Sequence, residues 1–80
     1  MPRFLIHHRH EPRECGAAYA SFRGFDSPLR HRRALATCPC GGHAIWWAVE
    51  ASSATDALAL VPAFVASRSA VVRVGEVDIP

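Results

Sequence analysis

The sequence contains no lysine, and charged side chains make up only 20% of its 80 residues. The nine basic residues are all arginines and are set against seven acids, so the formal net charge is +2. A charge this small, scattered among acids, forms no basic stripe of the kind that binds a phosphate backbone. We therefore expect no nucleic-acid partner.

Long apolar runs are absent too. No window approaches the roughly 20 apolar residues that cross a bilayer, and Met1-Pro2-Arg3-Phe4 enters a strand pattern without the apolar core of a signal peptide. We expect no membrane association and a cytoplasmic location. Cysteine is scarce, with three residues, and an odd number without an export signal fits reduced thiols or a metal better than a disulfide framework.

Half of the residues are apolar, which is typical of a folded protein with no disordered tail. The length predicts a single domain over residues 1–80. Such a domain buries about 60–65% of its unfolded surface, so the monomer should have modest stability and a partner chain would help.

The clearest element is a strand over residues 43–50. Gly41-Gly42 before it fits a two-residue turn, which predicts a hairpin whose first arm runs back through Thr37 and Leu35. One face of the strand is large and apolar, and the other is small and ends in the acid Glu50.

The remaining pattern predicts a strand over residues 3–10, a helix that begins at Pro12 and can end at Gly24, and a strand over residues 70–79. A second helix over residues 54–67 is capped by serine. Pro62 should interrupt this helix, ending it near residue 60.

This order predicts an α+β, ferredoxin-like βαββαβ fold with a four-stranded antiparallel sheet. We expect the first and third strands at its centre, as parallel neighbours, flanked by the fourth and second. Both helices should cover one face of the sheet and leave the other bare. Because a bare apolar sheet is usually covered by a second copy, we expect a homodimer.

The run Ile45-Trp46-Trp47-Ala48-Val49-Glu50, the serine-capped helix after it, Leu60-Val61-Pro62-Ala63-Phe64 and the valine-rich last strand resemble the dimeric α+β-barrel superfamily. Within it, residues 43–79 are most similar to muconolactone isomerase-like proteins. The resemblance implies two sheets packed into a barrel around a pocket. Members include isomerases, cyclases and monooxygenases, and a more distant set of small ferredoxin-like proteins binds nickel.

Alternation sorts the strand residues into two faces. The face expected to meet the helices contains Phe4, Ile6, Ile45, Trp47, Val49, Val72 and Val74. The opposite face, which would line the barrel, contains Leu5, His7, Arg9, Trp46, Glu50, Val71 and Arg73.

The polar residues of the second face should converge at one end of the sheet. There His7 could transfer a proton with Glu50 as its partner, while Arg9 and Arg73 hold a carboxylate or enolate. This is the chemistry of an isomerase or cyclase. The alternative is a rim of charges that pair across the dimer.

Three further residues complete the predicted substrate pocket. Trp46 and Leu5 would form its wall, although Trp46 suits a dimer interface equally well. His31, among the arginines of residues 30–33, could bind an anionic ligand at the barrel mouth, or lie in a solvated loop.

A second constellation is expected at the opposite end of the sheet, in the sequence Cys38-Pro39-Cys40-Gly41-Gly42-His43. Cys38, Cys40 and His43 could give three ligands to nickel, zinc or copper. Cys15, or the same hairpin of a partner chain, would have to complete the site. The alternative is a tight hairpin with small, half-buried cysteines.

The run His7-His8-Arg9-His10 also suggests a metal. In a strand His8 and His10 share a face and His7 does not, so this run supplies two ligands at most, with His31 as a conceivable third.

The sequence thus predicts a dimeric protein that binds a small anionic molecule without a cofactor and, if it is catalytic, isomerises or cyclises that molecule. A transition-metal-binding protein and a non-catalytic dimeric interaction protein are the two alternatives.

Overall fold

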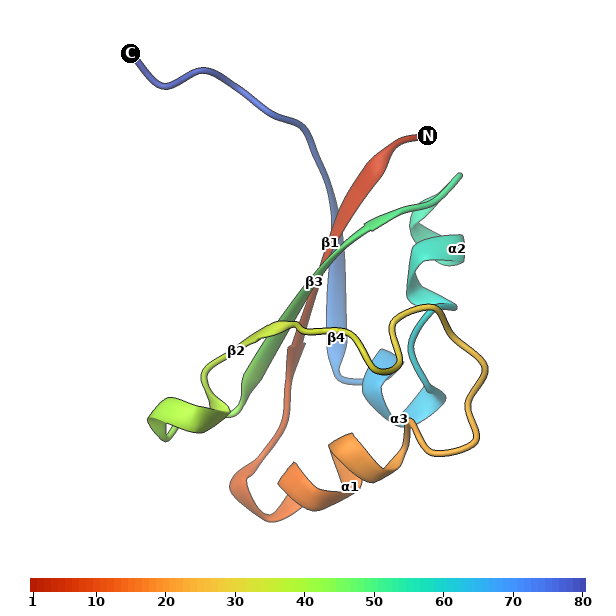
Figure 1. The fold of residues 1–80 in the computed structure, drawn as a ribbon, viewed down its shortest axis with the longest axis vertical. Coiled ribbons are helices and arrows are strands. Elements are labelled where there is room, and N and C mark those ends of the chain that lie inside the picture. Colours follow the sequence, from red (N-terminus) through yellow and green to blue (C-terminus); the bar gives the residue numbers. More distant parts are fainter.

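All 80 residues are described by the computed structural model, an α+β fold on one sheet (Figure 1). The strands are β1 (Arg3–Arg9), β2 (Leu35–Ala36), β3 (Ala44–Glu50) and β4 (Ser69–Val74). They lie in the order β2-β3-β1-β4, and every neighbouring pair is antiparallel. The predicted α+β class and antiparallel sheet are confirmed, and the strand order is compatible with a ferredoxin-like fold.

The expectation that the two central strands run parallel is wrong. In the β1–β3 pair Arg9 lies opposite Ala44 and Arg3 lies opposite Glu50. Strand β3 follows β2 through a reversal, and β2 runs in the same direction as β1, so β3 has to run against β1. The end of β1 therefore meets the start of β3.

The core lies on one face of the sheet. Ile6 is fully buried and shares this face with Trp47, its partner on β3. Ala57 and Val65, from the helices after β3, pack against the same cluster. One polar side chain, His8, is buried in this layer with no exposed surface.

The register of β4 differs from the predicted one. Val71 pairs with Ile6 and packs on the core, whereas Val72 pairs with Leu5 on the uncovered face and is 56% exposed. Arg73 lies opposite Phe4, so it too belongs to the helix side. Adjacent β-branched residues give no alternation, and the pairing with β1 decides their faces.

Strand β4 is also shorter than expected. It ends at Val74, and residues 75–80 form no regular structure. Val74 pairs with Arg3, the first residue of β1, and Pro2 before it has no amide hydrogen, while its carbonyl already accepts from the Ala51 amide.

The first helical segment joins a short turn η1 (Pro12–Glu14) to α1 (Cys15–Ala20). The Glu14 carboxylate accepts a hydrogen bond of 3.0 Å from the Glu11 amide and also forms an ion pair of 2.7 Å with Arg68. At 1.5 Å per residue α1 is about 9 Å long, against about 23 Å for a seven-residue strand. Accordingly α1 lies at the end of the sheet where β1 finishes and does not extend across it (Figure 1).

The second helical region is split, as Pro62 predicts. Helix α2 (Ala54–Leu58) begins at Ser53, whose hydroxyl accepts a hydrogen bond of 3.1 Å from the Asp56 amide. Pro62 then precedes α3 (Ala63–Ala66). None of these helices has the length and apolarity needed to cross a membrane.

The link between β2 and β3 is longer than a two-residue turn. It contains a helical turn, η2 (Cys38–Cys40), followed by Gly41 at φ 89°. Thr37 organises it, since its carbonyl accepts from the Gly42 amide and its hydroxyl accepts from the Ala44 amide. Proline at the second position of Cys38-Pro39-Cys40 favours this helical turn.

The uncovered face of the sheet is largely apolar. Val72 and Leu35 are exposed on it, and Leu5 and Trp46 are half-buried. A homodimer through this face remains a prediction.

Glycine substitutions test the β2–β3 link. A Cβ on Gly42 would lie 2.5 Å from the Thr37 Cβ, so Gly42→Ala should lower the free energy of unfolding by about 1–3 kcal/mol. Gly16 in α1 has open space around it, and Gly16→Ala should raise the free energy by about 0.5–1 kcal/mol. Urea unfolding measures both, and a stability gain in Gly42→Ala would contradict this packing.

Candidate metal centre

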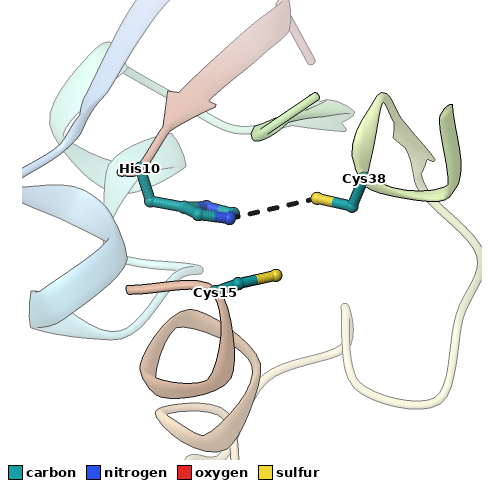
Figure 2. Close-up of side chains that lie close together, drawn as sticks. All are labelled: His10, Cys15 and Cys38. Atoms are coloured by element: carbon teal, nitrogen blue, oxygen red, sulfur yellow. Dashed lines mark hydrogen bonds between the residues drawn. The ribbon is translucent and has the colours of Figure 1, made fainter. Parts of the chain in front are cut away.

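Three side chains of metal-ligating type meet at the end of the sheet. The ligand atoms of His10, Cys15 and Cys38 all lie within 4.8 Å of one another. Figure 2 shows the imidazole and the two thiols pointing toward a common centre. His10 is buried, and both cysteines are half-buried and free of disulfides.

Backbone pairing positions the three residues. His10 directly follows β1, and its amide donates a hydrogen bond of 3.0 Å to the His43 carbonyl just before β3. This bond brings the end of β1 beside the β2–β3 link that contains Cys38. The chain then turns back at Glu11-Pro12, so that Cys15, the first residue of α1, lies next to His10.

The separation of His10 from Cys38 is close to that of two ligands in a tetrahedral site. Zinc–sulfur bonds of about 2.3 Å and zinc–nitrogen bonds of about 2.0 Å place neighbouring ligand atoms about 3.5–3.8 Å apart. The His10 Nε2 and Cys38 Sγ atoms are 4.0 Å apart. A contraction of a few tenths of an ångström would therefore bring this pair into ligand geometry.

Hydrogen bonds behind His10 fix the orientation of its lone pair. The Val65 carbonyl can only accept, so His8 Nδ1, 3.3 Å away, carries a proton and donates it. His8 Nε2 is then an acceptor, and it receives a hydrogen bond of 2.9 Å from His10 Nδ1. The remaining lone pair of His10 is on Nε2, which faces the cysteines. A second hydrogen bond of this kind is usual behind metal-ligating histidines.

The electrostatics keep both imidazoles neutral. Burial lowers the pKa of His8, and burial together with the neighbouring His43 lowers the pKa of His10. Burial, followed by the nearby Cys38, raises the pKa of Cys15. Neutral imidazole is the form that binds metal, whereas the cysteines would have to lose their protons on binding.

Tyr19 and His43 lie beside the group. A hydrogen bond with Cys38, and then burial, raise the pKa of Tyr19 to about 12. The His43 ring lies edge-on to His10 with the ring centroids 5.5 Å apart. Its Nδ1 atom is buried and has no hydrogen-bond partner.

The predicted metal ligands are therefore divided. Cys38 belongs to the group, His43 adjoins it and Cys40 is exposed outside it. His10 and Cys15 were each suggested by the sequence, but in separate clusters. The sequence did not predict the antiparallel β1–β3 pair, which joins the histidine run to the cysteine hairpin.

The residues predicted to be catalytic are not brought together. His7 lies opposite Trp46, and Glu50 lies opposite Arg3, four positions back along β1, which corresponds to about 13 Å along the strand. Arg9 is at the far end from Glu50, and Arg73 is on the helix side. Within one chain these residues do not form a single constellation.

The predicted pocket residues lie in two places. Leu5 and Trp46 share the uncovered face, where the Trp46 ring stacks on His7 at 4.8 Å and 7°. His31 is exposed in the loop before β2, with a positive φ of 63°. Leu5 and Trp46 therefore share one face with His7, whereas His31 lies apart from them in the loop.

No protein-family model matches this sequence, and neither the curated proteins nor the solved structures give a significant match. The resemblance to muconolactone isomerase-like proteins therefore stays a prediction.

The hydrogen-bond chain predicts the tautomers of two histidines. Both His8 and His10 should carry their proton on Nδ1, whereas exposed His31 should favour Nε2, the preferred site in a histidine side chain without such hydrogen bonds. Long-range ¹H–¹⁵N correlation spectra of the metal-free protein near neutral pH distinguish the two forms. A proton on His10 Nε2 would be incompatible with the arrangement described.

Proposed function

We propose that this protein binds one thiophilic transition-metal ion, with zinc the best match, through His10, Cys15 and Cys38. The observation that carries the proposal is the convergence of these ligand atoms within 4.8 Å. Two thiolates with imidazole suit zinc or copper(I), and a tetrahedral sulfur–nitrogen set favours zinc.

The support behind His10 strengthens the proposal. A chance meeting of polar side chains does not require an ordered second hydrogen bond, yet His10 Nδ1 is held by His8, which is held in turn by the Val65 carbonyl. His8 is fully buried, and a buried imidazole without hydrogen-bond partners would lower the free energy of unfolding. The two hydrogen bonds of His8 direct the Nε2 lone pair of His10 toward the cysteines, and a bound metal ion would be the partner of that lone pair.

His43 is our choice for the fourth ligand. Its ring lies edge-on to that of His10, and its buried Nδ1 lacks a hydrogen-bond partner. With His43 the site would be closed, as structural zinc sites are. A water molecule in its place would leave an open position of the catalytic type.

Bound at this point, the ion would hold three segments together: the end of β1, the start of α1 and the turn η2. Of these segments, the end of β1 is already joined to the β2–β3 link by the bond from the His10 amide to the His43 carbonyl, whereas the ion pair of Glu14 joins the start of α1 to Arg68, before β4. The role we assign is therefore a structural or metal-responsive one. It differs from the proton-transfer chemistry predicted for His7 and Glu50, whose separation gives that chemistry no support from one chain.

Native mass spectrometry with elemental analysis tests the proposal. The protein, purified under reducing conditions and supplied with Zn²⁺, should hold one ion per chain. Cys15→Ser and Cys38→Ser should each abolish stoichiometric retention, because a hydroxyl is a poor ligand for zinc. Co²⁺ should give the visible absorption of a tetrahedral thiolate site.

Cys40→Ser is the matched control. Cys40 is two residues from Cys38 but exposed and outside the group, so its loss should leave the stoichiometry unchanged. If Cys40→Ser loses the ion while Cys15→Ser keeps it, the site is the hairpin alone. Wild-type protein that ignores zinc, nickel and copper contradicts the proposal altogether.

A further inference from the structure

A separate cavity of about 320 Å³ opens between residues 19–36 and the helix side of the sheet. Its inner walls are apolar, formed by Phe22, Leu29, Ile45 and Trp47. Arg23, Arg30, His31 and Arg32 are the basic residues of its lining, which Tyr19, Ala34 and Ala36 complete, and no acidic residue contributes. None of the metal-ligating residues contributes to it.

The shape of the fold explains the gap. Helices α2 and α3 cover the sheet beside β1 and β4, but α1 is too short to cover β2 and β3. The loop over residues 21–34 takes its place, and the Ser27 hydroxyl donates a hydrogen bond of 2.6 Å to the Leu60 carbonyl. Because a loop packs less closely than a helix, space remains over Trp47.

The walls suit a flat ring. Phe22 and Trp47 lie with their centroids 5.8 Å apart at 46°, and Phe25 meets Phe22 edge-on. Aromatic side chains in this arrangement offer a ring face and a ring edge to a planar guest. The volume is at the lower end of the range for small-molecule sites, about 300–1,000 Å³.

The positive charge of the lining favours an anionic ligand. Every ion pair of the chain engages Arg3, Arg13 or Arg68, so the three arginines of the cavity have no acidic partner. Arg30 is half-buried there. A guanidinium without a carboxylate in a partly apolar site is well suited to bind one from a ligand through paired hydrogen bonds.

We propose that this cavity binds a small planar organic anion, an aromatic carboxylate of one or two rings. The ring would lie against Trp47 and Phe22, and the carboxylate would pair with Arg30, assisted by Arg23. This site does not depend on the metal centre. It differs from the pocket predicted between two sheets, because it lies on the opposite side of the same strands.

The two tryptophans provide an internal test of location. Trp47 lines the cavity, whereas Trp46 lies on the uncovered face and stacks on His7. Titration of the purified full chain with 2-naphthoate, followed by ¹H–¹⁵N spectra of both indole groups, should give a saturable shift of Trp47 and a much smaller one of Trp46. The neutral analogue 2-naphthamide, with the same rings, should bind at least about tenfold more weakly, as expected for the loss of a charged hydrogen bond.

Two arginine variants complete the design. Arg30→Gln should weaken 2-naphthoate binding about tenfold or more. Arg33→Gln, which removes an equal charge from the same loop but outside this cavity, should change it less than about twofold. If Arg30→Gln is poorly folded, Arg23→Gln replaces it with the same expected direction.

Several results would overturn the proposal. These are the absence of saturation at millimolar 2-naphthoate, a shift confined to Trp46, equal binding of 2-naphthamide, and equal effects of Arg30→Gln and Arg33→Gln. A shift confined to Trp46 would move the ligand to the uncovered face. The equal effects would mean general charge attraction without a defined site.

Discussion

The antiparallel pairing of β1 with β3 is the constraint on which the rest of this structure depends. Its last bond, from the His10 amide to the His43 carbonyl at 3.0 Å, joins the histidine run to the cysteine hairpin. The same pairing places Ile6 beside Trp47 in the core. It also places His7 and Glu50 on the uncovered face but four positions apart along the strands. One choice of strand direction thus creates the candidate metal-ligating group and separates the polar residues that a parallel pair would have gathered.

Much of the fold could be predicted because its helices and strands follow from local sequence patterns. Alternation marked β1 and β3, a serine cap marked α2, and Pro62 marked the break before α3. Strand direction is not a local property, and hydrophobic periodicity is the same for parallel and antiparallel neighbours. The valines of β4 gave no alternation either, so their faces depended on pairing with β1. The site was missed as a unit for this reason, although most of its residue types had been singled out.

The fully buried His8 shows how the core and the site are connected. An imidazole in an apolar layer lowers stability unless its polar atoms are satisfied. Here one nitrogen donates to the Val65 carbonyl at the end of α3, and the other accepts from His10. The side chain thus links the helix layer to the ligand group. A hydrocarbon of similar size would fill the same volume, but His10 would lose the group that fixes its orientation.

The three candidate ligands are spread over residues 10–38, and this spread has a consequence for the whole domain. An ion shared by them would act as a removable cross-link across a stretch of 28 residues. A ligand present at 100 times its dissociation constant stabilises the folded state by about 2.7 kcal/mol. Small domains have total stabilities of only about 5–15 kcal/mol. With such a cross-link, the supply of free metal in the surroundings would change the small unfolded fraction of this chain by about a hundredfold, and with it the rate of proteolysis.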